Sequence, residues 1–130
     1  MARLVNPPEL GAPVGYSNGV VVESGRLLFV AGQVAWDKDH RIVSADFLRQ
    51  LERALDNFLA VVQRSGGRPE NVEQMRIYVT DTKEYSERLK EIGVVWRARM
   101  GRHFPAMTLV EVSALLEDGA KVEIEGMAAI

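Results

Sequence analysis

Apolar residues recur at helical spacing in two stretches of the chain. In residues 45–64 they fall three or four positions apart with charged residues on the other side, which predicts an amphipathic helix. Ser44 is its expected N-cap, and the pair Gly66-Gly67 supplies its expected end. The apolar stripe of this helix consists of Leu48, Leu51, Leu55, Phe58, Leu59 and Val62.

A second helix is predicted to begin after Asp81 and to end at Gly101. Asp81 followed by Glu84 matches the capping-box pattern, which satisfies the free N–H groups of a first helical turn. The stripe of this helix consists of Tyr85, Leu89, Ile92, Trp96 and Met100.

The remaining apolar segments have the pattern of strands, and the first fifteen residues, rich in proline and glycine, are expected to form an extended arm. Because Ser24-Gly25 separates the first two strands, these two are predicted to pair as a hairpin. The predicted strands are residues 20–22, 26–30, 75–79, 108–113 and 121–129.

The resulting order is β-β-α-β-α-β-β, which predicts an α+β fold with both helices on one face of a sheet. The other face is then bare. Both alternating sets of side chains are substantially apolar in the predicted strands, as Leu27 and Phe29 against Leu28 and Val30 illustrate. A bare apolar face is usually buried against another subunit, so we expect a homo-oligomer with a small-molecule site between subunits.

Composition and charge narrow the classes of function. The chain of 130 residues is 47% hydrophobic with a formal net charge of −2, which predicts one domain over residues 1–130 and disfavours nucleic acid as a partner. It has no cysteine, which excludes a thiolate nucleophile and a Cys-ligated metal. No apolar run approaches the length of a membrane span or of a signal peptide, so we expect no membrane partner and a cytoplasmic location.

Few residues suggest chemistry by themselves. His40 and His103 both fall in predicted loops. Asp37 and Asp39 lie near His40, but two acidic residues in a turn are too common a pattern to predict a metal site. The second helix ends in a basic cluster of Arg97, Arg99, Arg102 and His103. Cations at this end of a helix interact favourably with the helix dipole and keep the surface soluble, but they would also suit a bound anion. Glu123 and Glu125 share one face of the last strand, either exposed at an edge or held in a polar cleft that suits proton transfer.

Several segments together resemble the Rid family, also called RidA/YjgF or L-PSP endoribonuclease. The matches run in the right order through nearly the whole chain. They are residues 6–8 with 15–20 ("GPYSQAV" in the family), 28–34 ("LLFVSGQ"), 78–81 ("VYLTD"), 104–112 ("PPARTTVEV") and 122–125 ("VEIEAIA").

The resemblance implies a chorismate-mutase-like α+β fold and a homotrimer with three clefts at the subunit interfaces. Family enzymes hydrolyse reactive imines and enamines, such as 2-aminoacrylate, to 2-oxo acids and ammonia without cofactor or metal. In those enzymes the arginine of the "PAR" motif binds the substrate carboxylate, and Met107 occupies that position here. A thioether cannot form the bidentate, charge-assisted pair that arginine forms, so we expect an altered substrate range, with the chain in a subgroup that lacks the cleft arginine.

Other site residues follow from the resemblance position by position. Glu123 stands where the family has its acid and is the expected catalytic residue. The expected substrate-binding residues are Tyr16, Ala31, Gly32, Gln33, Ala106 and Met107. Arg102 or His103 offers a replacement for the missing charge. Three functions stay open: an imine or enamine hydrolase with altered substrates, a non-catalytic trimer that binds a metabolite, and, least favoured, a ribonuclease.

Overall fold

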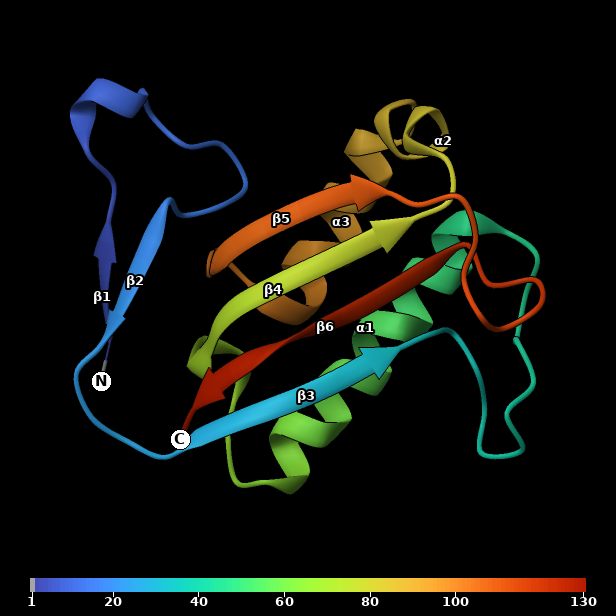
Figure 1. Cartoon of the computed structure of the whole chain (residues 1–130), viewed down its shortest axis with the longest axis horizontal. Coiled ribbons are helices and arrows are strands. Elements are labelled where there is room, and N and C mark those ends of the chain that lie inside the picture. The colour runs from blue at the N-terminus through green and yellow to red at the C-terminus, as the bar shows by residue number, and fades with distance from the viewer. Residues whose placement is uncertain (1) are drawn as a thin grey trace.

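The computed structural model describes residues 2–130, which form a sheet backed by helices and a separate N-terminal hairpin (Figure 1). Short 3₁₀ segments lie at Pro8–Leu10 and Pro69–Asn71. The elements in chain order are β1 (Ala2–Val5), β2 (Gly19–Val22), β3 (Leu27–Gln33), α1 (Phe47–Arg64), β4 (Val72–Val79), α2 (Thr82–Ser86), α3 (Leu89–Met100), β5 (Ala106–Glu111) and β6 (Val122–Ala129).

The main sheet has four strands in the order β3-β6-β4-β5. β4 and β5 run parallel, whereas β6 is antiparallel to both of its neighbours. The helices α1 and α3 cover the same face of this sheet (Figure 1). The predicted α+β class, with the helices on one side, is therefore confirmed, and β3 and β5 form opposite edges of the sheet.

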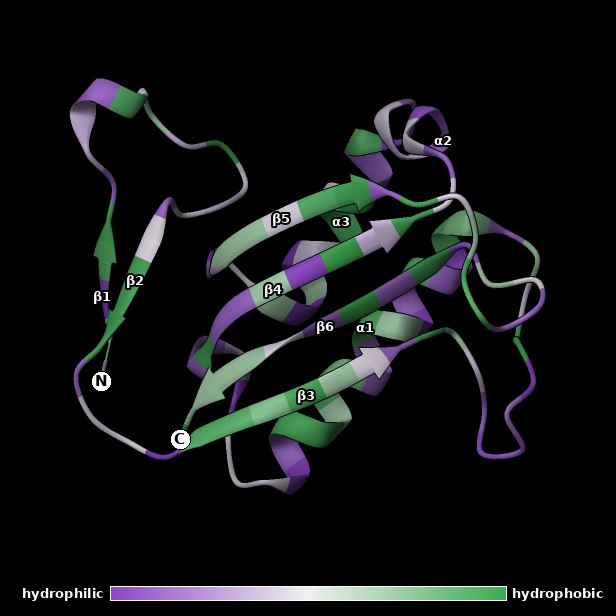
Figure 2. Cartoon of the chain, in the orientation of Figure 1, coloured by the Kyte–Doolittle hydropathy of each residue, from purple (hydrophilic) through white to green (hydrophobic). Residues whose placement is uncertain are grey.

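The core lies between α1 and the helix-facing side chains of the sheet. Ile77 and Ile124 are buried there, while the residues directly before and after each of them in its strand point to the other face. Figure 2 shows this alternation along β4. Phe58 of α1 presses on Gly126, where an added Cβ would lie 3.1 Å from the Phe58 ring and 2.2 Å from the backbone oxygen of Gln74. Only glycine permits this close contact between helix and sheet.

The opposite face of the sheet is open, as the sequence pattern predicted. Phe29 on β3 is 70% exposed and Val110 on β5 is 41% exposed. Arg76, Glu123 and Glu125 lie among these apolar side chains on the central strands. One face of the sheet is therefore buried under the helices, and the other face, with its apolar and charged side chains, is accessible.

The first helix begins two residues later than predicted. Asp46, not Ser44, is the N-cap of α1, and its carboxylate accepts a hydrogen bond from the backbone N–H of Arg49 at 3.1 Å. Ser44 instead accepts a bond from the N–H of Asp46. Both residue types accept backbone N–H groups well, so the sequence alone did not distinguish them.

The second predicted helix is two helices. Asp81 caps α2 as predicted and accepts hydrogen bonds from the N–H groups of Lys83 and Glu84. The chain then leaves helical geometry at Arg88, whose guanidinium donates to Asp46 at 3.0 Å and to Glu91 at 3.1 Å. The pair with Asp46 ties the break to the start of α1, whereas the pair with Glu91 lies within the first turn of α3. As expected, α3 ends at Gly101.

The predicted hairpin between residues 20–22 and 26–30 is wrong. β2 pairs with β1 in a two-stranded sheet of its own, in the register Ala2↔Val22. Arg26 exchanges both backbone hydrogen bonds with Ile130, each at 2.8 Å, so the start of β3 is tied to the C-terminus instead of to β2. The expected extended arm thus contains a strand, and we call residues 2–22 the N-terminal arm.

Candidate functional site

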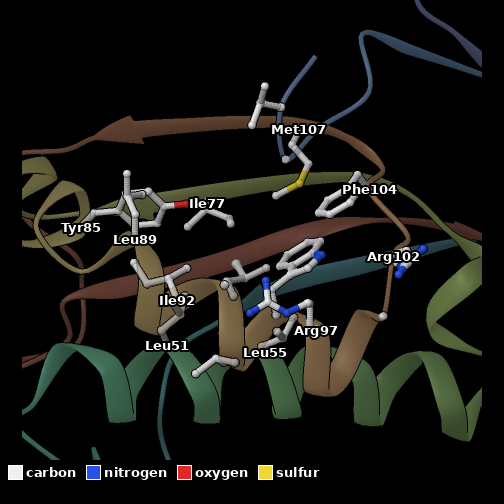
Figure 3. Close-up of a pocket in the computed structure, with 17 residues that line it drawn as sticks. Leu51, Leu55, Ile77, Tyr85, Leu89, Ile92, Arg97, Arg102, Phe104 and Met107 are labelled. Atoms are coloured by element: carbon white, nitrogen blue, oxygen red, sulfur yellow. The ribbon is translucent and has the colours of Figure 1, made fainter. Parts of the chain in front are cut away.

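A cavity of about 490 Å³ lies between the sheet and α3, a size typical of small-molecule sites (Figure 3). Every layer of the fold contributes to its wall. The apolar part of the wall includes Leu51 and Leu55 from α1, Ile77 from β4, Ile92 and Trp96 from α3, and Phe104 and Met107 at β5. Among the described residues that line it, no aspartate or glutamate is present.

Met107 is part of the cavity wall. It is the second residue of β5, and alternation turns Met107 and Leu109 toward the core while Thr108 and Val110 face the other way. Its side chain reaches down from β5 into the cavity (Figure 3). Met107, which the resemblance aligns with the family's arginine, therefore contributes an adaptable apolar surface to this cavity.

Three polar side chains line the same cavity: Tyr85, Arg97 and Arg102. In Figure 3, Tyr85 lies at one end with its hydroxyl directed toward Ile77, and Arg102 lies at the other end. Burial raises the pKa of the Tyr85 phenol, which keeps the hydroxyl protonated. The sequence placed Tyr85 in a helix stripe and Arg97 in a basic cluster, and it also offered Arg102 as a replacement for the missing charge.

The basic cluster divides into two parts. Arg99 pairs with Asp56 at 2.6 Å and with Glu52 at 3.5 Å, which fastens α3 to α1. Arg97 and Arg102 have no ion pair with any described residue and line the cavity instead. A Cβ at Gly93, one turn before Arg97 in α3, would lie 3.3 Å from its Nη1, so the guanidinium lies flat on that glycine. A glycine inside a helix costs about 0.5–1 kcal/mol relative to alanine and was the one sequence signal for this arrangement.

The N-terminal arm brings Tyr16 to the start of β5. Ser17 donates its backbone N–H to the Pro105 oxygen at 3.0 Å and its hydroxyl to the Phe104 oxygen at 2.6 Å, and it bridges to Ala106. Tyr16 is 39% exposed beside this connection. Val14 and Gly15, just before it, line the cavity. Three of the predicted site residues therefore lie together at the β5 edge: Tyr16, Ala106 and Met107.

The other predicted site residues gather around β3 and β6. A Cβ on Gly32 would lie only 2.0 Å from Oε2 of Glu123, so the carboxylate rests directly over the glycine backbone. Gln33 donates its side-chain amide to the backbone oxygen of Ala31 at 3.2 Å. Glu123 itself has no hydrogen bond or ion pair with a described side chain. It is the carboxylate on this face that is free to act on another molecule.

Glu125, two residues along β6, is engaged. The Tyr78 hydroxyl donates a short hydrogen bond to it, and Arg76 lies 3.8 Å away. That hydrogen bond raises the pKa of Tyr78. The two glutamates that the sequence placed on one face therefore differ: Glu125 has a structural partner, whereas Glu123 is available.

One chain does not unite the two groups of predicted site residues. β3 and β5 are opposite edges of the sheet, which places them roughly 14 Å apart at the usual strand spacing. Glu123 and Met107 also point to opposite faces. Within one chain the two groups therefore do not form a single site.

The histidines and the loop carboxylates have local partners. The ring of His103 contacts the backbone oxygen of Val72 through Nε2, and the ring of His40 stacks on Trp36 with centroids 4.0 Å apart. Asp37 accepts backbone N–H groups within its own turn. Within residues 2–130 no group of three or more His, Cys, Asp or Glu side chains is placed to hold a metal ion, and no helix is long and apolar enough to cross a membrane.

Comparisons with known proteins agree on one family. The model of the family described as endoribonuclease L-PSP matches residues 8–130. A relative named protein DfrA from Myxococcus xanthus is 35% identical over 118 residues, which cover 87% of this chain and 83% of the relative. A 2-iminobutanoate/2-iminopropanoate deaminase from Escherichia coli K12 is 27% identical over 132 residues, which cover 98% of each chain.

The solved structures agree with the sequence comparisons. The crystal structure of YyfB from Yersinia pestis, described as a Rid-family protein of unknown function, superposes with a TM-score of 0.88 at 31% identity. The alignment covers 99% of this chain and 98% of that one. The match extends over the sheet, the helices and the arm that together form the candidate site.

Proposed function

Because the chain belongs to the Rid (RidA/YjgF, endoribonuclease L-PSP) family, we propose that it hydrolyses the C=N bond of small imine metabolites, with a substrate range altered by Met107. Deaminases of 2-imino acids are among its relatives, which supports imine chemistry at the level of the family. The observation that carries the proposal is the free carboxylate of Glu123 over the Gly32 backbone, next to an engaged Glu125.

Glu123 has the properties that the hydrolytic step needs. The carboxylate accepts a proton from water as the new C–O bond forms, and it returns that proton to the imine nitrogen. As the C–N bond of this adduct breaks, the remaining hydroxyl proton passes to the nitrogen, for which Glu123 is again the proposed carrier. Ammonia then leaves and a carbonyl remains, so water and imine become oxo product and ammonia. Main-chain groups near Ala31-Gly32 and Ala106-Met107 are the proposed contacts for the oxygen, and Tyr16 borders the site.

The proposed site forms between copies of the chain in a homotrimer. The open sheet face of one copy supplies Glu123, and the β5 edge of the next supplies Met107 and Tyr16. The exposed Phe29 and Val110 on that face favour its burial in such an assembly. A small molecule would then bind between two subunits, with no cofactor required.

Met107 distinguishes this site from that of a deaminase acting on 2-iminopropionate. Without the arginine, a small imino acid loses a hydrogen bond to a charged group, which is worth about 1.5–3 kcal/mol, or roughly 10- to 100-fold in affinity. Its orientation for attack by water suffers as well. The preferred substrates are therefore imines that bind through apolar surface or through a cation placed elsewhere.

The test is the release of carbonyl product from freshly generated imines, compared with the spontaneous rate without protein. The panel runs from 2-iminopropionate to imines with larger apolar groups. Glu123→Gln is expected to abolish the protein-dependent rate, whereas Glu125→Gln, a change of the same kind two residues away, is expected to retain it. Gel filtration with light scattering checks that both variants keep the assembly of the parent.

The outcomes separate the alternatives. A protein-dependent rate that survives Glu123→Gln would remove the role assigned to this carboxylate. No acceleration of any imine in the panel would favour the non-catalytic metabolite-binding trimer. RNA cleavage, suggested by the older family name, has the least support because both histidines have local partners and the net charge is −2.

A further inference from the structure

The charged lining of the cavity is entirely cationic. Arg97 and Arg102 both line it, no acidic residue does, and neither arginine forms an ion pair with a described residue. The sequence offers an excess of acids, and Arg99 in the same helix takes two of them. Both are exposed at the rim of the cavity. Two exposed arginines without an ion pair beside one apolar cavity are suited to an anionic group of a ligand, above all a planar carboxylate.

The rest of the wall suits an apolar body of considerable size. Leu51, Leu55, Ile77, Ile92 and Trp96 surround a volume of about 490 Å³, far more than a three-carbon acid fills. Met107 adds a side chain that adapts to different shapes. A ligand that displaces water from this surface gains in proportion to its apolar area, so a ring or a branched chain is favoured over a small polar molecule.

Tyr85 adds a third feature at the end away from Arg102 (Figure 3). Its hydroxyl is directed along the cavity and has no hydrogen-bond partner among the described residues. Since its phenol stays protonated, it donates a hydrogen bond to a group at the far end of a ligand. Arg102 therefore lies at one end of the cavity, Arg97 lies in the middle beside apolar side chains, and the hydrogen-bond donor Tyr85 lies at the other end (Figure 3).

We propose that this cavity binds an amphipathic carboxylate with an aromatic or branched body, held by Arg97 and Arg102, with its distal polar group at Tyr85. The inference rests on the proposed function, because Met107 belongs to the same site, and it names the substrate class. The cation that the "PAR" position lacks is supplied from α3 and from the loop after it. The carboxylate lies near the helix, and the space beside Met107 is left to apolar groups.

The first experiment measures binding without any turnover. Calorimetric titrations compare 3-phenylpropionate with 3-phenylpropionamide, which has the same body and no charge. The carboxylate is expected to bind about 10- to 100-fold more tightly than the amide. Arg97→Gln and Arg102→Gln are each expected to remove most of that difference, while Arg64→Gln, at the exposed end of α1, leaves it intact.

The second experiment locates the ligand. Methyl-labelled methionine gives an NMR signal for Met107, assigned by its loss in Met107→Leu, and that signal is expected to shift as 3-phenylpropionate is added. 3-(4-Hydroxyphenyl)propionate is expected to bind several-fold more tightly than 3-phenylpropionate to the parent protein. In Tyr85→Phe that gain disappears while the preference for carboxylate over amide persists.

Two results would overturn the inference: equal binding of acid and amide, or a Met107 signal that does not move at saturating ligand. The proposed hydrolysis fails separately. If imines are hydrolysed in a Glu123-dependent way but neither probe binds, the substrate class is wrong and the reaction stands. If the probes bind as described and no imine is hydrolysed, the cavity is a carboxylate-binding site and the reaction is wrong.

Discussion

Two glycines on neighbouring strands offer a test in which stability and activity separate. An added Cβ at Gly32 would lie 2.0 Å from Oε2 of Glu123, and an added Cβ at Gly126 would lie 2.2 Å from the backbone oxygen of Gln74. The two overlaps are nearly equal in size, but the obstructing atoms differ. One is the end of a flexible side chain, and the other is backbone fixed in the β4–β6 ladder.

For Gly32→Ala the carboxylate of Glu123 has to retreat by more than 1 Å, since ordinary contacts lie beyond 3 Å. Glu123 is half-buried and has no hydrogen bond or ion pair with a described side chain to lose, so its rotation is cheap. The free energy of unfolding is therefore expected to change by only about 0.5 kcal/mol. Hydrolysis is far more sensitive, because displacing a reacting group by about 1 Å costs on the order of 100-fold in rate. Gly32→Ala should therefore remain folded and lose nearly all imine turnover.

For Gly126→Ala the strand itself has to move, and Phe58 blocks the same direction at 3.1 Å. Overpacking of this kind costs about 1–3 kcal/mol or more. Chemical denaturation of both variants, with imine hydrolysis measured on the same samples, makes the comparison. The reasoning is refuted if Gly32→Ala keeps the parental rate, or if it loses as much stability as Gly126→Ala.

Three further predictions concern other parts of the chain. Glu73 is 7% exposed, and burial raises its pKa. Its favourable contribution to the free energy of unfolding is therefore complete below the unfolded pKa near 4.5 and is lost as pH rises through the native pKa. Glu73→Gln should raise Tm at about pH 8 and give little gain near pH 4, and an equal gain at both pH values would contradict this. Asp46→Ala should lower the free energy of unfolding by about 1 kcal/mol in denaturant titrations, and Ser44→Ala by clearly less, because Asp46 is the N-cap. Met107→Arg should raise kcat/KM for 2-iminopropionate about 10- to 100-fold, with Met107→Leu unchanged as control, and an unaltered rate would show that this position does not meet the substrate carboxylate.

The sequence predicted the elements whose signals are local. The 3.6-residue stripe in residues 45–64 identified α1, and the Asp81 cap identified the start of α2. The alternation along β4 and β6 identified the strands and their open face. These features depend on neighbours a few positions away, which is the range over which periodicity and capping act.

The errors and omissions involve partners distant in the sequence. The turn at Ser24-Gly25 is a good hairpin signal, but the bonds between Arg26 and Ile130 and the pairing of β2 with β1 prevent that hairpin. The break at Arg88 depends on Asp46, 42 residues away. The cavity between α3 and the sheet has no local signature except Gly93, so the position of Arg97 in its wall emerges only from the folded chain.

Glu123 lies on the open face of the central strand β6, and Met107 lies on the helix-facing side of the edge strand β5. This separation makes the proposed site divisible between chains. In the proposed trimer, a subunit with a damaged Glu123 still offers an intact Met107 wall, and a subunit damaged at that wall still offers Glu123. When two such inactive proteins are mixed, unfolded and reassembled in equal amounts, about one quarter of the interfaces combine the two intact halves. Activity would then return from two inactive parent proteins. In a cell that expresses a mutant chain together with the parental chain, either mutation would therefore reduce activity only in part.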